Sequence, residues 1–410
     1  MILNDRIDDL CHRVETDVIR WRRDIHEHPE MANDEIRTAE LVDRHLRSLG
    51  IETKTGVAHT GVVGLLEGKK DGPVIALRAD MDALPVAEEV DLPFASKVRS
   101  RWNGQDVGVM HACGHDAHTA ILMGVASVLS ELRDELPGAV KLIFQPAEEG
   151  APEGEEGGAE LMVREGVLDD PRPAAIFGLH VTSGYETGSI NVRPGALMAA
   201  IDSFRVRIRG SQTHAAYPWR GIDPIVVASQ IILGLQTIPS RQLNSIVAPA
   251  VVSVGAIHGG VRENIIPDEV EMMGTLRTLD PAMRDEVRQR VRRTMEKIAE
   301  SAGATIDLDL QRGYPVVMND AILVDQIMPV FRSLAGESKV EIMNPVLGGE
   351  DFAFFQQEIP GVFFFLGTRP PGLSAEDAAP NHSPRFFVDE AGLGLGVRSL
   401  AHVAADRLTR

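Results

Sequence analysis

Residues 139–150 read AVKLIFQPAEEG, and this stretch decides the fold class. A short apolar run ends in a proline turn, and two adjacent carboxylates, Glu148 and Glu149, follow directly. A continuous apolar run that stops at a turn signal is typical of a strand buried on both faces of an α/β sheet. We therefore predict an α/β fold with a central, mostly parallel sheet.

Three further apolar runs precede polar residues in the same way. They are PVIALR (73–78) before Asp80, VGVM (107–110) before the cluster around His111, and AAIFGL (174–179) before His180. Three of the four runs indicate buried strands. In open α/β sheets, ligands gather beyond the carboxyl ends of the strands, where loops converge without disturbing the core. We therefore expect one common site that contains Asp80, Cys113, Glu148, Glu149 and His180.

The order of elements changes at Ala196. Before it, we expect two helices up to about Leu49 and a helix after His115. From residue 196 the pattern predicts strand 204–210, helix 223–235, strands 245–257 and 269–279, helix 281–302 and strand 304–311. This βαββαβ order is that of a ferredoxin-like domain. We therefore predict that residues 196–311 are a domain inserted into a catalytic domain of residues 1–195 and 312–410, which ends with a helix near 321–334, strand 361–367 and a closing helix.

The predicted inserted domain also has a charge pattern that its topology would explain. In a ferredoxin-like sheet the last strand lies antiparallel beside the first, so Asp307 and Asp309 would lie near Arg205, Arg207 and Arg209 on one face. The alternative is that these are unrelated, solvated side chains.

Composition narrows the class of partner. The chain has 41 Lys+Arg against 60 Asp+Glu, a net charge of −19, which repels nucleic acid and anionic membrane surfaces. No apolar run is long enough to span a bilayer, and the start MILNDRIDDL lacks the pattern of a signal peptide. Only Cys11 and Cys113 are present, too few for a disulfide framework. We expect a cytoplasmic protein that acts on a small molecule.

The segment HACGHDAH (111–118) concentrates metal-binding side chains. Cys and His bind divalent transition ions, and catalytic sites add carboxylates. Of Glu148 and Glu149, one can bind metal while the other handles protons. His382 lies in a loop stiffened by Pro380 and Pro384. Each residue alone is better explained structurally, but their joint placement after successive strands favours a metal site, with His111 and His118 as packing or hydrogen-bonding neighbours.

At these motifs the sequence closely resembles the metal-dependent amidohydrolase and carboxypeptidase family that includes hippurate hydrolase, bacterial N-acyl-amino-acid amidohydrolases and plant auxin-conjugate hydrolases. The resemblance runs nearly end to end. It rests on RRDIHEHPE (22–30), RADMDALP (78–85), MHACGHDAH (110–118), FQPAEEG (144–150), GLH (178–180), GSQTHAAYP (210–218), ENIIP (263–267), GTLRT (274–278), GGEDF (348–352) and NHSP (381–384). After HPE this chain has Met31 to Glu35 where many relatives carry a glycine and an aromatic residue, so no preference for an aromatic acyl group is carried over.

The resemblance implies two divalent metal ions per chain, of zinc, manganese, nickel or cobalt. Cys113 would bridge them, and the other ligands would be His115, Glu149, His180 and His382. Glu148 would be the general base, with Asp82 supporting the site.

The same resemblance makes the inserted domain a lid through which two chains, or a dimer of dimers, associate. His214 would reach over the partner's active site to stabilise the oxyanion. The residues implied in substrate binding are Asn264, Arg277, Gly348 and Gly349. Taken without the resemblance, Arg277 is simply an exposed arginine on a strand.

The function that follows is hydrolysis of the amide bond in N-acyl amino acids. On the same site, deacetylation of an N-acetyl-diaminopimelate type of substrate and carboxypeptidase action on small peptides are alternatives. A cysteine hydrolase, with Cys113 activated by His115, would leave His180, His382 and Glu149 without a role. A non-catalytic binding dimer is the remaining alternative, and the intact ligands and Glu148 argue against it.

Overall fold

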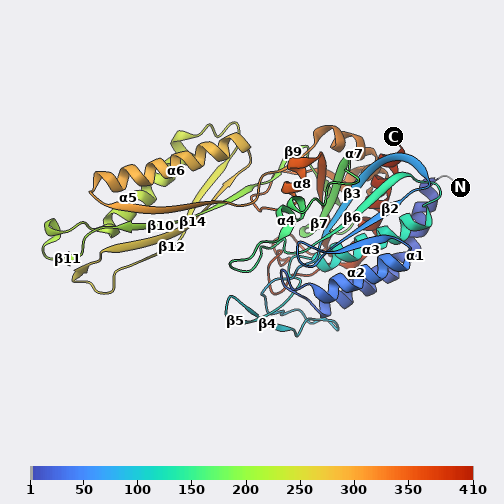
Figure 1. Ribbon diagram of the computed structural model, residues 1–410, viewed down its shortest axis with the longest axis horizontal. Coiled ribbons are helices and arrows are strands. Elements are labelled where there is room, and N and C mark those ends of the chain that lie inside the picture. The colour runs from blue at the N-terminus through green and yellow to red at the C-terminus, as the bar shows by residue number, and fades with distance from the viewer. Residues whose placement is uncertain (1–2, 410) are drawn as a thin grey trace. The chain divides into compact units, whose positions relative to one another are not determined.

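The computed structural model describes residues 3–409, which divide into two compact units (Figure 1). The first contains residues 3–195, 318–344 and 354–409 of the described chain, and the second contains residues 196–317 and 345–353. Within residues 3–409, no helix combines the length and apolar character needed to cross a membrane.

The first unit is built on an eight-stranded mixed sheet with the order β1-β2-β6-β3-β7-β18-β8-β17. Its strands are β1 (Glu52–Val57), β2 (Gly61–Glu67), β3 (Lys70–Asp80), β6 (Pro137–Gln145), β7 (Ala175–Glu186), β8 (Ile190–Val192), β17 (Val340–Ile342) and β18 (Gly361–Arg369). The central strands β6, β3, β7 and β18 are parallel neighbours, whereas β1, β2 and β8 join antiparallel. The predicted α/β class is confirmed.

Three of the four apolar runs form adjacent central strands, as expected: residues 139–145 lie in β6, 73–78 in β3 and 174–179 largely in β7. The VGVM run (107–110) instead begins in β5 (Gln105–Gly108) and continues beyond it. Strands β4 (Arg99–Trp102) and β5 form a small hairpin outside the main sheet. Asp80 ends β3 and Glu148 follows β6, so both lie at the carboxyl ends of the parallel strands, whereas β7 continues to Glu186 and His180 lies within it rather than after it.

Helices cover the sheet of the first unit (Figure 1). They are α1 (Leu3–Glu27), α2 (Ile36–Ser48), α3 (His115–Glu131), α4 (Gly158–Arg164), α7 (Ala321–Ala335), α8 (Ala353–Glu358) and α9 (Leu393–Thr409). Helices α3 and α9 both pack against β3, and α1 packs against both helices. Almost every side chain of α3 is buried, in keeping with its largely apolar sequence after His118. The metal-ligand motif thus begins a helix that the core holds rigidly.

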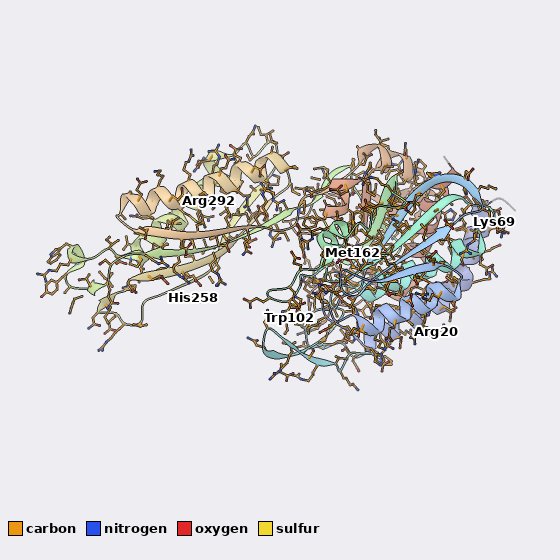
Figure 2. The ribbon with its side chains drawn as sticks, in the orientation of Figure 1. Arg20, Lys69, Trp102, Met162, His258 and Arg292 are labelled. Atoms are coloured by element: carbon orange, nitrogen blue, oxygen red, sulfur yellow. The ribbon has the colours of Figure 1, made fainter. Side chains whose placement is uncertain are left out.

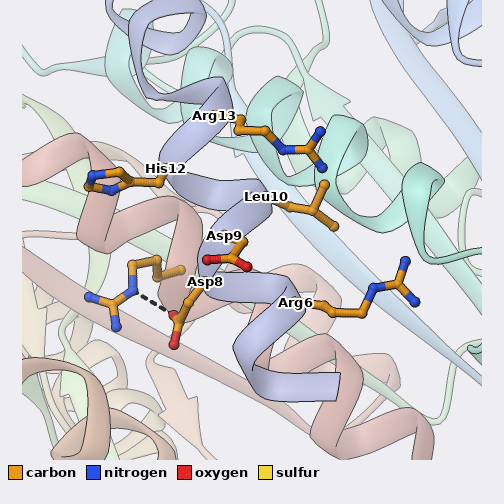
Figure 3. A pocket seen from close by; sticks show the side chains of 7 residues that line it. Arg6, Asp8, Asp9, Leu10, His12 and Arg13 are labelled. Atoms are coloured by element: carbon orange, nitrogen blue, oxygen red, sulfur yellow. Dashed lines mark hydrogen bonds and ion pairs between the residues drawn. The ribbon is translucent and has the colours of Figure 1, made fainter. Parts of the chain in front are cut away.

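The first and last helices are also joined by charge. Asp8 of α1, labelled in Figure 3, accepts a hydrogen bond at Oδ1 from Arg398 Nε of α9 over 2.9 Å. His402 Nε2 lies 3.1 Å from the same oxygen. The two ends of the described chain are therefore tied within one unit.

The second unit has the predicted βαββαβ order. It consists of β10 (Ala200–Arg209), α5 (Pro224–Thr237), β12 (Ala250–Gly259), β14 (Glu269–Thr278), α6 (Pro281–Ser301) and β15 (Thr305–Arg312), with a fully antiparallel sheet of order β12-β14-β10-β15. Asp223 and Asp280 cap the two helices, each before a proline in the first turn. The buried faces of α5 and α6 pack on the sheet, while Arg292 on α6 and His258 on β12 lie at the surface (Figure 2).

Short elements complete the chain. They are β9 (Gly195–Met198), β11 (Thr213–His214), β13 (Ile265–Ile266), β16 (Val317–Asn319), and the short helical turns η1 (Pro218–Arg220), η2 (Ile238–Gln242), η3 (Glu337–Lys339) and η4 (Glu390–Gly392).

The predicted cross-strand register in the second unit is confirmed. Arg205 lies opposite Asp309 and Arg207 opposite Asp307. The closest carboxylate to Arg207 nevertheless comes from the other neighbouring strand, because its Nε lies 3.0 Å from Glu269 Oε1 on β14. The charges on this face are complementary across three strands.

Candidate metal centre

The five candidate metal ligands all belong to the first unit. Cys113 and His115 lie where α3 begins, Glu149 follows β6, His180 is on β7 and His382 is in the loop after β18. Residues from four separate segments therefore converge, as the positions after successive strands predicted.

The thiol of Cys113 lies at the centre of this group. Its Sγ is 3.3 Å from His180 Nε2 and 3.2 Å from His382 Nε2. His382 Nε2 is in turn 3.1 Å from Glu149 Oε1. Two ligand sets result, Cys113 with His115 and His180, and Cys113 with Glu149 and His382, each with its ligand atoms within 4.8 Å of one another.

The separations of 3.1–3.3 Å lie at or slightly below the spacing of atoms that bind one divalent ion. With metal–ligand bonds of about 2.0–2.3 Å and tetrahedral angles, ligand atoms are expected about 3.3–3.8 Å apart. Cys113 is the candidate ligand that both sets share. The donor atoms of thiolate, imidazole and carboxylate are those that zinc and its neighbours accept.

Hydrogen bonds at Nδ1 orient the two buried histidines, His115 and His180. His180 Nδ1–H donates to the carbonyl of Val181 over 2.7 Å, which directs the lone pair of Nε2 toward Cys113. His115 Nδ1–H donates to Asp82 Oδ1 over 3.1 Å. Its Nε2 is buried and has no hydrogen-bond partner among residues 3–409. Metal-binding histidines usually have their second nitrogen held in this way, so His115 and His180 fit the role of ligands.

The electrostatics of the centre favour a cation. Burial lowers the pKa of His115, but the carboxylates of Asp80, Asp82 and Glu149 outweigh it and raise that pKa to about 10. Burial, followed by the charges of Glu149 and Glu148, raises the pKa of the Cys113 thiol well above its ordinary value. A thiol held in its protonated form is a poor nucleophile, which argues against the cysteine hydrolase. A divalent cation would both offset the carboxylates and deprotonate the thiol.

The backbone around Cys113 permits only particular residues. Gly114 has a φ of +94°, and a Cβ there would lie 2.2 Å from Val181 Cγ2. Glycine is therefore required for Cys113 and His115 to approach β7 this closely. His382 also has a left-handed φ, of +71°, an uncommon conformation that tends to occur at functional sites.

Asn381 locks the loop that carries His382. Its Nδ2 donates to the carbonyls of Cys113, at 3.1 Å, and Val181, at 3.2 Å. The backbone N–H of His382 donates to the carbonyl of Ala112 over 2.7 Å. Asn381 had no predicted role, although its position beside His382 in NHSP is a signal for one.

A third group, Asp80 with His115 and His118, also brings potential ligands together. His118 is fully engaged, because its Nδ1–H donates to Asp80 Oδ1 over 2.5 Å and its Nε2 accepts from the Val181 N–H over 2.8 Å. The predicted role of His118 as a hydrogen-bonding neighbour is confirmed, and it holds β7 beside His180. His111 is buried, and burial lowers its pKa to about 3, so it is a neutral packing neighbour.

Comparison with known proteins identifies the family. Residues 76–406 match the model of peptidase family M20/M25/M40. The chain belongs to this family. Thermostable carboxypeptidase 1 of Saccharolobus solfataricus is 41% identical over 404 residues, covering 98% of both chains. N-acetylcysteine deacetylase of Bacillus subtilis is 40% identical, covering 95% of this chain and 96% of the relative.

A solved structure extends the comparison to three dimensions. The YXEP protein of Bacillus subtilis, described as a dinuclear metal binding peptidase of the M20 family, superposes with a TM-score of 0.80 at 38% identity, covering 97% of this chain and 99% of that one. The M20 protein described here is therefore a metal-dependent amidohydrolase, and the resemblance seen in its sequence motifs is confirmed.

The predicted general base, Glu148, also belongs to the first unit of this M20 enzyme, whereas His214 and the predicted substrate-binding residues lie in the second unit. His214 on β11 pairs with Ile265 on β13, and the N–H of Ala215 donates to the carbonyl of Asn264 over 3.0 Å. His214 and Asn264 are thus neighbours on one exposed ribbon. Because His214 Nδ1 accepts from the Ala216 N–H over 3.0 Å, its Nε2 carries the proton and is a donor.

Arg277, Gly348 and Gly349 also belong to the second unit. Arg277 is half-buried on β14, and burial alone lowers its pKa, with no carboxylate among residues 3–409 acting on it. The carbonyl of Gly348 accepts from the Ala199 N–H over 2.9 Å. Gly349 lies against the side chain of Ile201, since a Cβ there would lie 2.1 Å from Ile201 Cδ1.

Proposed function

We propose that this M20 amidohydrolase cleaves the amide bond of N-acyl amino acids and releases a carboxylate and a free amino acid. The observation that carries the proposal is the thiol of Cys113, placed between two ligand sets with a further carboxylate, Glu148, beside them. Glu148 Oε2 lies 3.8 Å from His115 Nε2. The same site suits an N-acetyl-diaminopimelate deacetylase or a carboxypeptidase of small peptides, so the substrate class is what needs testing.

In this proposal two divalent ions are held per chain. Cys113 would contribute to both sets, His115 and His180 would complete one, and Glu149 and His382 would complete the other. Zinc, manganese, nickel and cobalt all accept this mixed donor set. Bound ions of this kind lower the pKa of water and polarise a carbonyl.

Glu148 is proposed as the general base. It is 5% exposed and lies three residues after the end of β6, next to Glu149. It takes a proton from the attacking water and returns it to the leaving amine. Asp82 supports the reaction indirectly, because its Oδ1 orients His115 while its Oδ2 accepts from the Glu149 N–H over 2.9 Å.

Residues of the second unit are proposed to bind the substrate. Arg277 and Asn264 would hold the α-carboxylate, and the backbone at Gly348 and Gly349 would lie along the substrate. A half-buried guanidinium without an acidic partner has lost part of its hydration, which a charge-assisted bond to a substrate carboxylate would offset. The donor Nε2 of His214 would stabilise the oxyanion in the site of a partner chain.

The test is amine release from matched substrates. We expect hydrolysis of N-acetyl and longer N-acyl amino acids and much weaker hydrolysis of N-acyl amines that lack the α-carboxylate. The panel should include N-acetyl-diaminopimelate and dipeptides. Hydrolysis confined to dipeptides would replace the proposal with the carboxypeptidase.

For Arg277→Ala we expect the preference for the free α-carboxylate to fall roughly 10–100-fold in kcat/KM, because a hydrogen bond to a charged group contributes about 1.5–3 kcal/mol. The measurement is the ratio of kcat/KM for an N-acyl amino acid to that for the N-acyl amine of the same side chain. Arg209→Ala, an exposed arginine of the same sheet, is the control. An unchanged ratio in Arg277→Ala would remove the clamp from the proposal.

We also propose that two copies associate through the second unit. Its edge strand β12 leaves one row of backbone groups unpaired within the sheet, and α5 exposes Leu233 and Val226, which are 70% and 52% accessible. Light scattering after size-exclusion chromatography is expected to give a dimer, and Leu233→Asp to weaken it. Arg292→Glu on α6 is the matched control. A wild-type monomer at all concentrations would refute the association.

A further inference from the structure

Glu35 occupies a helix-capping position without capping the helix. It directly precedes α2, yet its side chain makes no bond to the helix N-terminus. Glu30 performs that task instead, because its Oε1 accepts from the Arg37 N–H over 2.9 Å and its Oε2 from the Thr38 N–H over 2.8 Å. The carboxyl group of Glu35 is therefore available for another contact.

That contact is with the loop that carries Glu148 and Glu149. The Glu35 side chain is fully buried, and its Oε1 accepts from the Ala147 N–H over 2.9 Å. Thr60 Oγ1 donates to Oε2 over 2.5 Å, which fixes the carboxyl group from the other side. Ala147 has a φ of +54°, the left-handed region that residues other than glycine rarely adopt, so this backbone conformation needs a fixed partner.

A second carboxylate holds the same loop just beyond Glu148. Asp82 Oδ2 accepts from the Glu149 N–H over 2.9 Å. The backbone is thus anchored at Ala147 by Glu35 and at Glu149 by Asp82, on both sides of Glu148. Only the Asp82 anchor comes from a residue that the sequence motifs singled out.

We propose that Glu35 is a positioning residue, which fixes the backbone at Ala147 and thereby sets the direction of the Glu148 carboxylate and the place of Glu149 in the metal centre. The inference rests on the proposed roles of Glu148 and Glu149. Glu35 belongs to the segment after HPE, where this chain departs from many relatives. The proposal gives that segment a role in positioning Glu148 and Glu149.

Glutamine is the conservative replacement at this position. Burial and the negative charge of Asp82 raise the pKa of Glu35 to about 8, so the group is largely uncharged at neutral pH. The oxygen of a glutamine side chain can accept from the Ala147 N–H, and its NH₂ can donate to the Thr60 hydroxyl. Glu35→Gln should therefore keep both contacts, whereas Glu35→Ala loses both.

The experiment compares Glu35→Ala, Glu35→Gln and Glu30→Ala in the metal-loaded full chain. For Glu35→Ala we expect kcat to fall about 10–100-fold with KM nearly unchanged, and zinc affinity in chelator competition to fall over a similar range, the usual cost of losing a contact that orients a metal site. Glu35→Gln should stay within threefold of wild type in both. Glu30→Ala, which removes the cap of α2, should lower Tm and leave kcat unchanged.

A merely structural role would give a different result. If Glu35→Ala lowers Tm alone, with kcat and zinc affinity intact, the proposal is wrong. If Glu35→Ala does not fold, Thr60→Val removes one of the two contacts and should lower kcat several-fold, and a Thr60→Val enzyme with wild-type kcat would then overturn the proposal.

Zinc affinity is measured without substrate, so it separates this proposal from the proposed function. If Glu148→Gln were active, Glu148 would not be the general base. The zinc affinity of Glu35→Ala would still decide whether Glu35 positions the metal centre.

Discussion

Glu148→Gln is expected to retain its metal ions and to lose amide hydrolysis by roughly three orders of magnitude, within the range that general acid–base catalysis contributes. Glutamine keeps the size of the side chain but cannot accept the proton of the attacking water or deliver one to the leaving amine. The loss should appear in kcat, because Glu148 is not among the groups proposed to hold the substrate.

The measurement is kcat for an N-acyl amino acid together with elemental analysis of the variant. Glu153→Gln is a suitable control, since Glu153 is an exposed carboxylate of the loop that follows. Full metal content with near-normal turnover in Glu148→Gln would disprove its role as the base. Loss of metal would instead make Glu148 a ligand.

Removal of metal is expected to have the second large effect. Elemental analysis of the purified protein should give about two divalent ions per chain. Chelation should lower kcat by about three orders of magnitude or more, since metal ions contribute several kcal/mol to such reactions and each ~1.4 kcal/mol is a factor of ten. Restoring zinc, manganese, nickel or cobalt in turn should recover activity and identify the metal that supports the fastest turnover.

The two cysteines provide an internal control for this experiment. Cys113→Ala removes the ligand shared by both sets and should lose metal and activity together. Cys11→Ser, at a buried thiol of α1, should keep both. Activity that resists chelation and is abolished by thiol alkylation at Cys113 would restore the cysteine hydrolase.

Much of the fold and the composition of the site follow from local sequence patterns. The apolar runs predicted β3, β6 and β7, because a strand buried on both faces must be apolar along its length. The βαββαβ order predicted that Arg205 and Arg207 face Asp309 and Asp307, since strand order alone determines which strands are neighbours. The candidate metal ligands were chosen from their places in and after the apolar runs, and the role assigned to each came from the family resemblance.

The partners of individual side chains required the tertiary structure. Nothing near Arg207 in the sequence shows that Glu269 is the closest carboxylate, and nothing near Glu35 shows that its carboxyl group meets the amide of Ala147. The directions of the His115 and His180 lone pairs likewise depend on Asp82 and Val181. Burial and periodicity are properties of a short segment and can be read along the chain. A hydrogen bond between distant segments depends on how the whole core packs, so only the folded chain decides which atoms meet.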